Sequence, residues 1–143
     1  MTQAFLPGDP VPWFKAATTT APSFTFDSVA GRHVALLFYG TAAAPLATEA
    51  LAAVMRRRAI FDDGERTFFG VTVDPGDAAA GRIAEHVPGI RHFVDSGRRV
   101  SRLYGRVSGE NGAEEYAPLW IVLDPTLRVL FTAPITATDA VLD

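Results

Sequence analysis

The chain has 143 residues, of which 48% are hydrophobic and 20% charged, with a formal net charge of −3 at pH 7. This length suits one domain with a substantial core, and ten Phe and two Trp exclude a disordered chain. No apolar run reaches the roughly 18 residues of a membrane span, and the first residues carry no secretory signal. The acidic balance disfavours nucleic acid or an anionic membrane as the partner. We therefore expect residues 1–143 to form a single cytoplasmic domain.

The sequence contains no cysteine. This excludes disulfide bonds, thiolate metal sites and catalysis by any thiol of this chain. The three histidines are His33, His86 and His92. His86 and His92 could bind a metal together with Asp95, but their spacing matches no regular set of ligands, so scattered structural histidines are the favoured interpretation. We expect neither a metal nor another cofactor.

The first half of the chain predicts loops, then a buried strand, then a helix. The proline-rich segment 7–12 cannot form a helix, and residues 24–26 alternate as a short strand does. The continuous apolar run 34–39 predicts a strand that is buried on both faces. A loop of small residues, 41–45, leads to an alanine-rich helix over about 46–60.

The second half predicts an alternation of strands and helices. The expected ranges are 67–73, 91–94, 119–123 and 128–132 for the strands, and 78–86 and 95–104 for the helices. Asp95 or Ser96 would cap the last of these helices, and residues 107–116 read as a polar loop. Asp74 and Asp124 each follow a strand and precede a proline, which favours turn capping over catalysis. The alternation predicts an α/β domain with a largely parallel sheet that ends in a hairpin.

Six short segments share their order and spacing with the motifs of one known family. They are residues 6–14, 34–40, 48–49, 70–74, 94–107 and 120–125. Together they resemble the peroxiredoxins, the alkyl hydroperoxide reductase and thiol-specific antioxidant group, over about residues 6–132. The resemblance implies a thioredoxin-like fold, with a central mixed sheet flanked by helices and a C-terminal β-hairpin. Such a fold normally adds a final helix, for which residues 138–143 are too few, so we expect that helix to be truncated or absent.

The chemistry that this resemblance implies is missing from the sequence. Peroxiredoxins carry Pro-x-x-x-Thr-x-x-Cys, in which the cysteine attacks the peroxide while the threonine and a distant arginine hold it. Matching the proline to Gly40 places the threonine at Ala44 and the cysteine at Ala47, and the arginine falls on Pro118. Thr41 keeps a hydroxyl near the loop, but no base activates it. These five positions therefore form a degenerate peroxidatic site that contains no catalytic residue.

Pro118 has a second interpretation within the same resemblance. Thioredoxin-like folds often place a cis proline before this strand, facing the active-site loop, and X-Pro is the only bond for which the cis isomer costs little. We therefore predict a cis peptide bond between Ala117 and Pro118. The alternative is a trans proline that opens the strand.

The function expected is that of a catalytically degenerate accessory or protein-interaction domain. Its partner would be another protein, a second copy in a homodimer, or an attached C-terminal domain, because an apolar loop at a former site favours contact. The opening segment and the small-residue loop also resemble the domain that precedes an iron- and 2-oxoglutarate-dependent dioxygenase domain, which implies the N-terminal part of a longer protein. Two alternatives stay open: a redox module that acts with a partner or such a dioxygenase domain, and a small-ligand site in the vacated loop.

Overall fold

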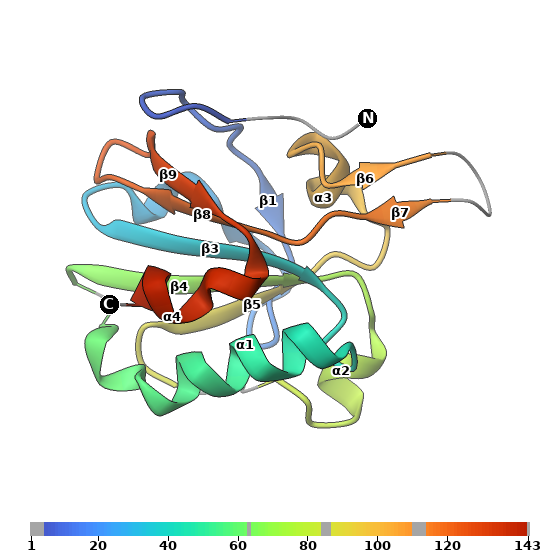
Figure 1. Ribbon diagram of the computed structural model, residues 1–143. Coiled ribbons are helices and arrows are strands. Elements are labelled where there is room, and N and C mark those ends of the chain that lie inside the picture. Colours follow the sequence, from blue (N-terminus) through green and yellow to red (C-terminus); the bar gives the residue numbers. More distant parts are fainter. Residues whose placement is uncertain (1–4, 63, 84–86, 110–113, 143) are drawn as a thin grey trace.

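The computed structural model describes residues 5–62, 64–83, 87–109 and 114–142. A five-stranded mixed sheet, in the order β5-β4-β3-β8-β9, forms its centre (Figure 1). Its strands are β3 (His33–Gly40), β4 (Arg66–Thr72), β5 (Ile90–Val94), β8 (Leu119–Leu123) and β9 (Val129–Ala133). β3, β4 and β5 run parallel, while β8 is antiparallel to both β3 and β9. The predicted mixed sheet with a C-terminal hairpin is therefore confirmed.

Helices and short strands surround this sheet. The helices are α1 (Pro45–Arg56), α2 (Gly76–Ala79), α3 (Arg99–Leu103) and α4 (Thr138–Leu142), with 3₁₀ turns η1 (Phe26–Val29), η2 (Arg58–Ile60) and η3 (Ile135–Ala137). Two small antiparallel pairs are β1 (Lys15–Ala16) with β2 (Phe24–Thr25), and β6 (Val107–Ser108) with β7 (Glu115–Tyr116). No helix in the described ranges is long and apolar enough to cross a membrane.

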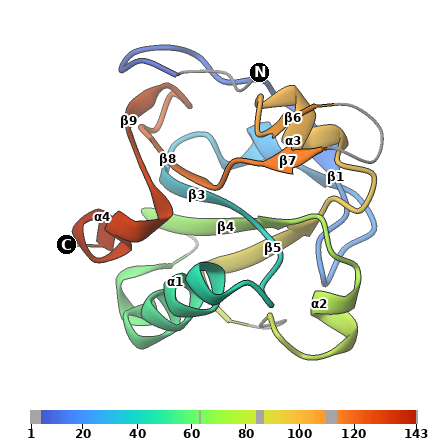
Figure 2. The ribbon, with the colours of Figure 1, turned by 45° about the vertical axis from the view of Figure 1, so that its right-hand side comes forward.

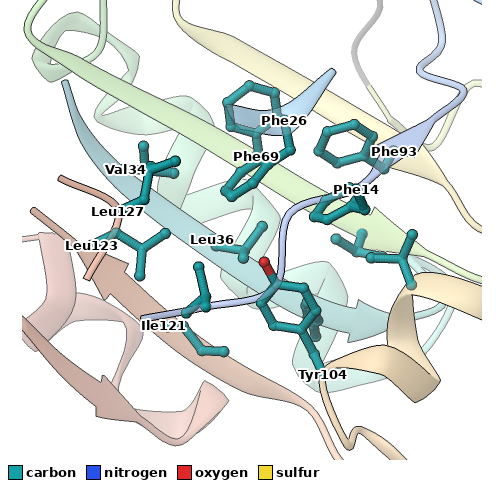
Figure 3. Packing of buried hydrophobic residues seen from close by; sticks show 14 of the residues in the cluster. Phe14, Phe26, Val34, Leu36, Phe69, Phe93, Tyr104, Ile121, Leu123 and Leu127 are labelled. Atoms are coloured by element: carbon teal, nitrogen blue, oxygen red, sulfur yellow. The ribbon is translucent and has the colours of Figure 1, made fainter. Parts of the chain in front are cut away.

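The alternation of side chains along the buried strands divides the core between the two faces of the sheet. On one face, Leu36 of β3 and Phe69 of β4 pack against aromatic side chains from the N-terminal segment (Figure 3). There the ring centroids of Phe14 and Phe26 lie 4.8 Å apart in a stacked pair. On the other face, Leu37 and the fully buried Trp120 pack beneath α1 and α4. Burial on both faces explains why β3 and β4 read as continuous apolar runs.

Three expectations about local structure were wrong in detail. The helix expected over 78–86 is replaced by α2, and the left-handed φ of +70° at Gly81 prevents its continuation; residues 84–86 lie outside the described ranges. α3 begins at Arg99 rather than after Asp95, although the Asp95 carboxylate still accepts the N–H groups of Val100 and Ser101 at 3.1 and 2.7 Å. The polar loop over 107–116 contains the paired strands β6 and β7.

The final helix expected for the fold is present as the short α4. α4 has five residues, and its last described residue, Leu142, is buried on the α1 face. The indole Nε1–H of Trp120 donates to Thr138 at 3.0 Å, and Thr138 in turn donates to the carbonyl of Ile135. These contacts fix α4 against the sheet beside α1.

Candidate functional site

The candidate site lies where β3 ends and α1 begins. Gly40 closes the strand with a φ of +80°, a conformation that favours glycine. A Cβ at this position would also meet the ring of Tyr116 at 3.2 Å, so the turn packs tightly under that ring. The chain then crosses residues 41–44 and enters α1 at Pro45, a common first residue of a helix.

The two positions matched to the threonine and the cysteine of peroxiredoxins lie together at the start of α1. Ala44 is the N-cap and has no side chain to cap the helix, whereas Thr48 donates its hydroxyl to the carbonyls of Ala42 and Ala44 at 2.8 and 3.0 Å. Ala47 is buried, with 1% of its surface exposed, but its neighbour Leu46 is 49% exposed. The helix N-terminus thus presents methyl groups where the resemblance implied a hydroxyl and a thiol.

A fully buried carboxylate, that of Asp77, holds this loop from the side of α2. Its Oδ2 accepts the backbone N–H of Ala42 at 2.8 Å and the hydroxyl of Thr72 at 2.5 Å. Its Oδ1 accepts the Nε–H of Arg82 at 2.7 Å and, more weakly, the Thr41 hydroxyl at 3.3 Å. Figures 1 and 2 show α2 beside the N-terminal end of α1, which is the arrangement that this network requires.

Asp74 completes the network at the surface. It accepts the Thr41 hydroxyl at 2.8 Å and the N–H of Gly76 at 2.9 Å, and its other neighbour is the Arg82 guanidinium at 3.3 Å. The hydrogen bond from Thr41, the N–H of Gly76 and the charge of Arg82 lower the pKa of Asp74 below its ordinary value. The expected capping role of Asp74 is therefore present, and Thr41, expected to be a residual hydroxyl, serves to fix the loop.

Behind the loop, Tyr39 and His92 form a buried polar pair. The Tyr39 hydroxyl lies 2.9 Å from Nδ1 of His92. The pair meets above Gly70, because a Cβ there would come within 2.6 Å of His92 Nδ1 and 2.7 Å of Tyr39 Cε1. Burial lowers the pKa of His92 from 6.5 to about 4, with a smaller opposing effect from Asp77, so the imidazole is neutral at pH 7.

Tyr116 covers the other side of the Gly40 turn. Its hydroxyl and that of Ser101 lie 3.0 Å apart, and burial raises the pKa of Tyr116 above its ordinary value. Nearby in sequence, the guanidinium of Arg106 is buried and donates to the carbonyl of Tyr104 at 3.1 Å. Sequence reasoning singled out neither Tyr116 nor Asp77, since their roles depend on contacts between distant segments.

Pro118 stands at the same edge of the sheet, just before β8. The register pairs Phe38 with Leu119, so Pro118 lies level with the end of β3, and its side chain is exposed. The prediction of a cis bond was wrong, because no cis peptide bond occurs in the described residues. The preceding Ala117 donates its N–H to the backbone carbonyl of Arg106 at 2.7 Å. This bond fixes the segment before β8, where a trans proline opens the strand.

The two described histidines, His33 and His92, do not gather into a metal site. His92 forms a hydrogen bond with Tyr39, and the Asp95 carboxylate accepts backbone N–H groups of α3. His86 lies outside the described residues. Within the described part of the chain, no group of three His, Asp or Glu side chains is placed to hold a metal ion.

Comparison with known proteins agrees with this architecture. PrxQ from Xylella fastidiosa, solved as a cysteine-to-serine mutant, is 13% identical with a TM-score of 0.79 over 98% of this chain and 94% of its own. The peroxidoxin BcpB from Mycobacterium tuberculosis is 18% identical with a TM-score of 0.74, over 97% of this chain and 94% of its own. A yeast mitochondrial 1-Cys peroxiredoxin is 21% identical with a TM-score of 0.74, over 97% of this chain and 74% of its own.

These structures show a shared thioredoxin-like fold. No curated protein sequence matches the chain significantly. The sequence model of the AhpC/TSA family matches residues 7–131, which include every strand of the central sheet in whole or in part and the entire loop from Gly40 to α1. The chain therefore belongs to the AhpC/TSA family.

Proposed function

We propose that this chain is a catalytically degenerate member of its family, which acts as an accessory or interaction domain and has no peroxidase activity of its own. The observation that carries the proposal is the buried methyl group of Ala47 in the first turn of α1, in a chain without any cysteine. A peroxide-reducing thiol needs the positive potential of a helix N-terminus, and here that position offers no nucleophile. Ala44 and Pro118 likewise offer no hydroxyl and no guanidinium to hold a peroxide.

The hydrogen-bond network around the loop supports a structural role for this region. Asp77 and Asp74 bind Thr41 and the N–H of Ala42, so the loop is anchored to α2 at both of its first residues. Satisfied buried polar networks make a region rigid. A loop fixed in this way is suited to presenting a constant surface to a partner.

The surface offered to the partner would include Leu46. This side chain is 49% exposed at the start of α1, directly after the anchored loop. The partner would be a second copy of this chain, another protein, or an attached C-terminal domain such as the dioxygenase domain that the sequence resemblance implied. An exposed leucine on a rigid loop provides apolar contact with little loss of conformational entropy.

Peroxide consumption by the purified chain tests the catalytic half of the proposal. With dithiothreitol as reductant, and hydrogen peroxide or tert-butyl hydroperoxide as substrate, we expect no turnover above the buffer rate. Turnover proportional to protein concentration would overturn the proposal. A Thr41→Val variant is the matched control, since it removes the one hydroxyl of the loop's first turn and should leave the absence of turnover unchanged.

Molar mass in solution tests the interaction half. Light scattering on the wild type and on a Leu46→Glu variant would show whether α1 mediates self-association. If the wild type is a dimer and Leu46→Glu is a monomer, the result supports a homodimer that forms through α1. If the variant is still a dimer, the dimer interface lies elsewhere on the chain. A strict monomer at high concentration would remove the second copy from the possible partners.

A second candidate is a small-ligand site beside the loop. A hollow of about 510 Å³ lies along α1, lined by residues that include Ala43, Leu51, Met55 and Arg82. Thermal denaturation with a panel of small organic acids would test it, and no shift across the panel would count against this candidate.

A further inference from the structure

A different hollow lies at the opposite end of the sheet from the loop. It is a partly open hollow of about 420 Å³ and lies near the beginnings of β3 and β4. Its floor includes Ala35 of β3 and Val122 of β8, which the antiparallel register places opposite each other. The segment after α1 contributes Phe61 to one wall, and α4 contributes Leu142 to the other. This volume falls within the range of about 300–1,000 Å³ that is typical of small-molecule sites.

The hollow follows from two features of the sequence. Ala35 is the smallest side chain on the α1-facing side of β3, where Leu37 and Tyr39 fill the space further along the strand. α1 ends at Arg56, so no helix of the described residues lies over this floor between η2 and the short α4. The result is an apolar space between α1 and α4 at their ends far from the loop.

The rim of the hollow is basic. His33 and Arg66 are paired in the register of β3 and β4, and alternation places both side chains on the same face as Ala35. Arg57 adds a second guanidinium from the end of α1. No Asp or Glu is among the described residues that line the hollow. The neighbouring carboxylate of Asp62 accepts the backbone N–H groups of Gly64, Glu65 and Arg66 at 2.9, 2.6 and 3.3 Å, and the charge of Arg66 adds to the effects that lower the pKa of Asp62.

We propose that this hollow is a binding site for a small amphipathic carboxylate, with an unbranched acyl chain on the apolar floor and its carboxylate at the Arg57 and Arg66 rim. An acyl chain gains from burial against Val122, Phe61 and Leu142, and a guanidinium recognises a carboxylate through charge-assisted hydrogen bonds. The site is separate from the loop and requires no reaction there. It would give the chain a ligand that does not depend on the loop between β3 and α1.

A titration with sodium decanoate, followed by ¹H–¹⁵N NMR, tests the proposal. We expect saturable shifts at Ala35, Phe61 and Val122. An Ala35→Leu variant should abolish the shifts by filling the floor, and Arg66→Ala should weaken binding about tenfold, as expected for one charge-assisted hydrogen bond. Arg56→Ala is the matched control, because that exposed arginine of α1 does not line the hollow, and it should bind as the wild type does.

Two further ligands separate the contributions of the ligand's acyl chain and of its carboxylate charge to binding. Decan-1-ol, which lacks the carboxylate, should bind more weakly than decanoate, and acetate, which lacks the chain, should not saturate. Equal binding of decanol, equal binding by Arg66→Ala, or shifts confined to the hollow beside Leu51 would overturn the proposal. A Val122→Phe variant provides a second way to fill the floor if Ala35→Leu does not give a folded spectrum.

Discussion

The backbone N–H of Ala42 lies 2.8 Å from a carboxylate oxygen of Asp77, 35 residues further along the chain. This bond ties the loop that follows β3 to the short helix that follows β4. Asp77 is fully buried, so the loop depends on a charged group that water does not reach. The stability of the candidate site should therefore depend on Asp77 more than on any residue of the loop itself.

Replacing this carboxylate should destabilise the protein. Asp77→Ala leaves the backbone N–H of Ala42 without an acceptor, and an unpaired buried donor costs about 1–3 kcal/mol. The Thr72 hydroxyl loses its acceptor at 2.5 Å but keeps the carbonyl of Gly40 at 3.0 Å. Urea unfolding monitored by Trp fluorescence measures the loss. Asp74→Ala is the matched control: its side chain is 35% exposed, so its loss should be clearly smaller. Equal losses from the two substitutions would show that burial of Asp77 does not determine its importance.

Stability should fall as the pH drops from 6.5 toward 4, because of His92. Its pKa is about 4 in the folded state, against 6.5 for an exposed histidine, so the unfolded state binds more protons within this window. The stability that neutral burial provides is complete above pH 6.5 and is lost on acidification, by about 3 kcal/mol in total. Urea unfolding at several pH values would measure it.

A His92→Phe variant should lose most of this slope, whereas His33→Asn, at an exposed histidine, should keep it. The carboxylates of Asp62 and Asp124, whose pKa values are lowered by backbone and side-chain hydrogen bonds, act in the same direction but only below about pH 4. An unchanged slope in His92→Phe would assign the pH dependence to another group.

A methyl group at Gly70 should separate Tyr39 from His92. Its Cβ would lie 2.6 Å from the imidazole and 2.7 Å from the tyrosine ring, and both side chains are buried. Overpacking of this kind costs about 1–3 kcal/mol, so Gly70→Ala should lower the free energy of unfolding by that amount. Gly97→Ala, where a Cβ meets nothing within 4 Å, serves as the control. A Gly70→Ala protein as stable as the control would show that the pair has room to move.

The sequence predicted the sheet much better than it predicted the site. Residues 34–39 and 119–123 are continuous apolar runs of strand length, a pattern that can be recognised without knowledge of tertiary contacts. Both form strands of the central sheet. The end of the strand at Gly40 and the helix that follows the loop were also expected, because glycine and alanine have strong local conformational preferences. The five expected positions lie at one end of the sheet, although Pro118 is trans.

The groups that hold the site could not be predicted in the same way. Asp77 and Tyr116 each act on Gly40 or its neighbours across long stretches of sequence, and only the packing of α2 and β7 brings them there. The one available signal was the Asp-Pro-Gly-Asp stretch that begins at Asp74. Its first carboxylate was correctly interpreted as a turn cap, but the second is the one that is buried.

Two single-cysteine variants would measure how exposed the first turn of α1 is to solvent. Because the chain has no cysteine, a thiol introduced at Ala47 or Leu46 is the only one to react with Ellman's reagent. Ala47 is 1% exposed and Leu46 is 49% exposed. The thiol of Leu46→Cys should therefore react freely, whereas the thiol of Ala47→Cys should react only when α1 opens locally. An opening free energy of about 3 kcal/mol would slow labelling about a hundredfold.

The same Ala47→Cys variant addresses catalysis. With alanine still at position 44 and proline at 118, its thiol has neither partner that would hold a peroxide, so hydrogen peroxide should oxidise it no faster than an ordinary buried thiol. Adding Ala44→Thr and Pro118→Arg should raise the oxidation rate if these positions correspond to the family's site. A triple variant that is oxidised no faster than the single variant would show that the correspondence of positions 44 and 118 is wrong.

In the labelling experiment, reaction of Ala47→Cys at the rate of Leu46→Cys would show that the first turn of α1 is open, although Asp77 anchors the loop before it.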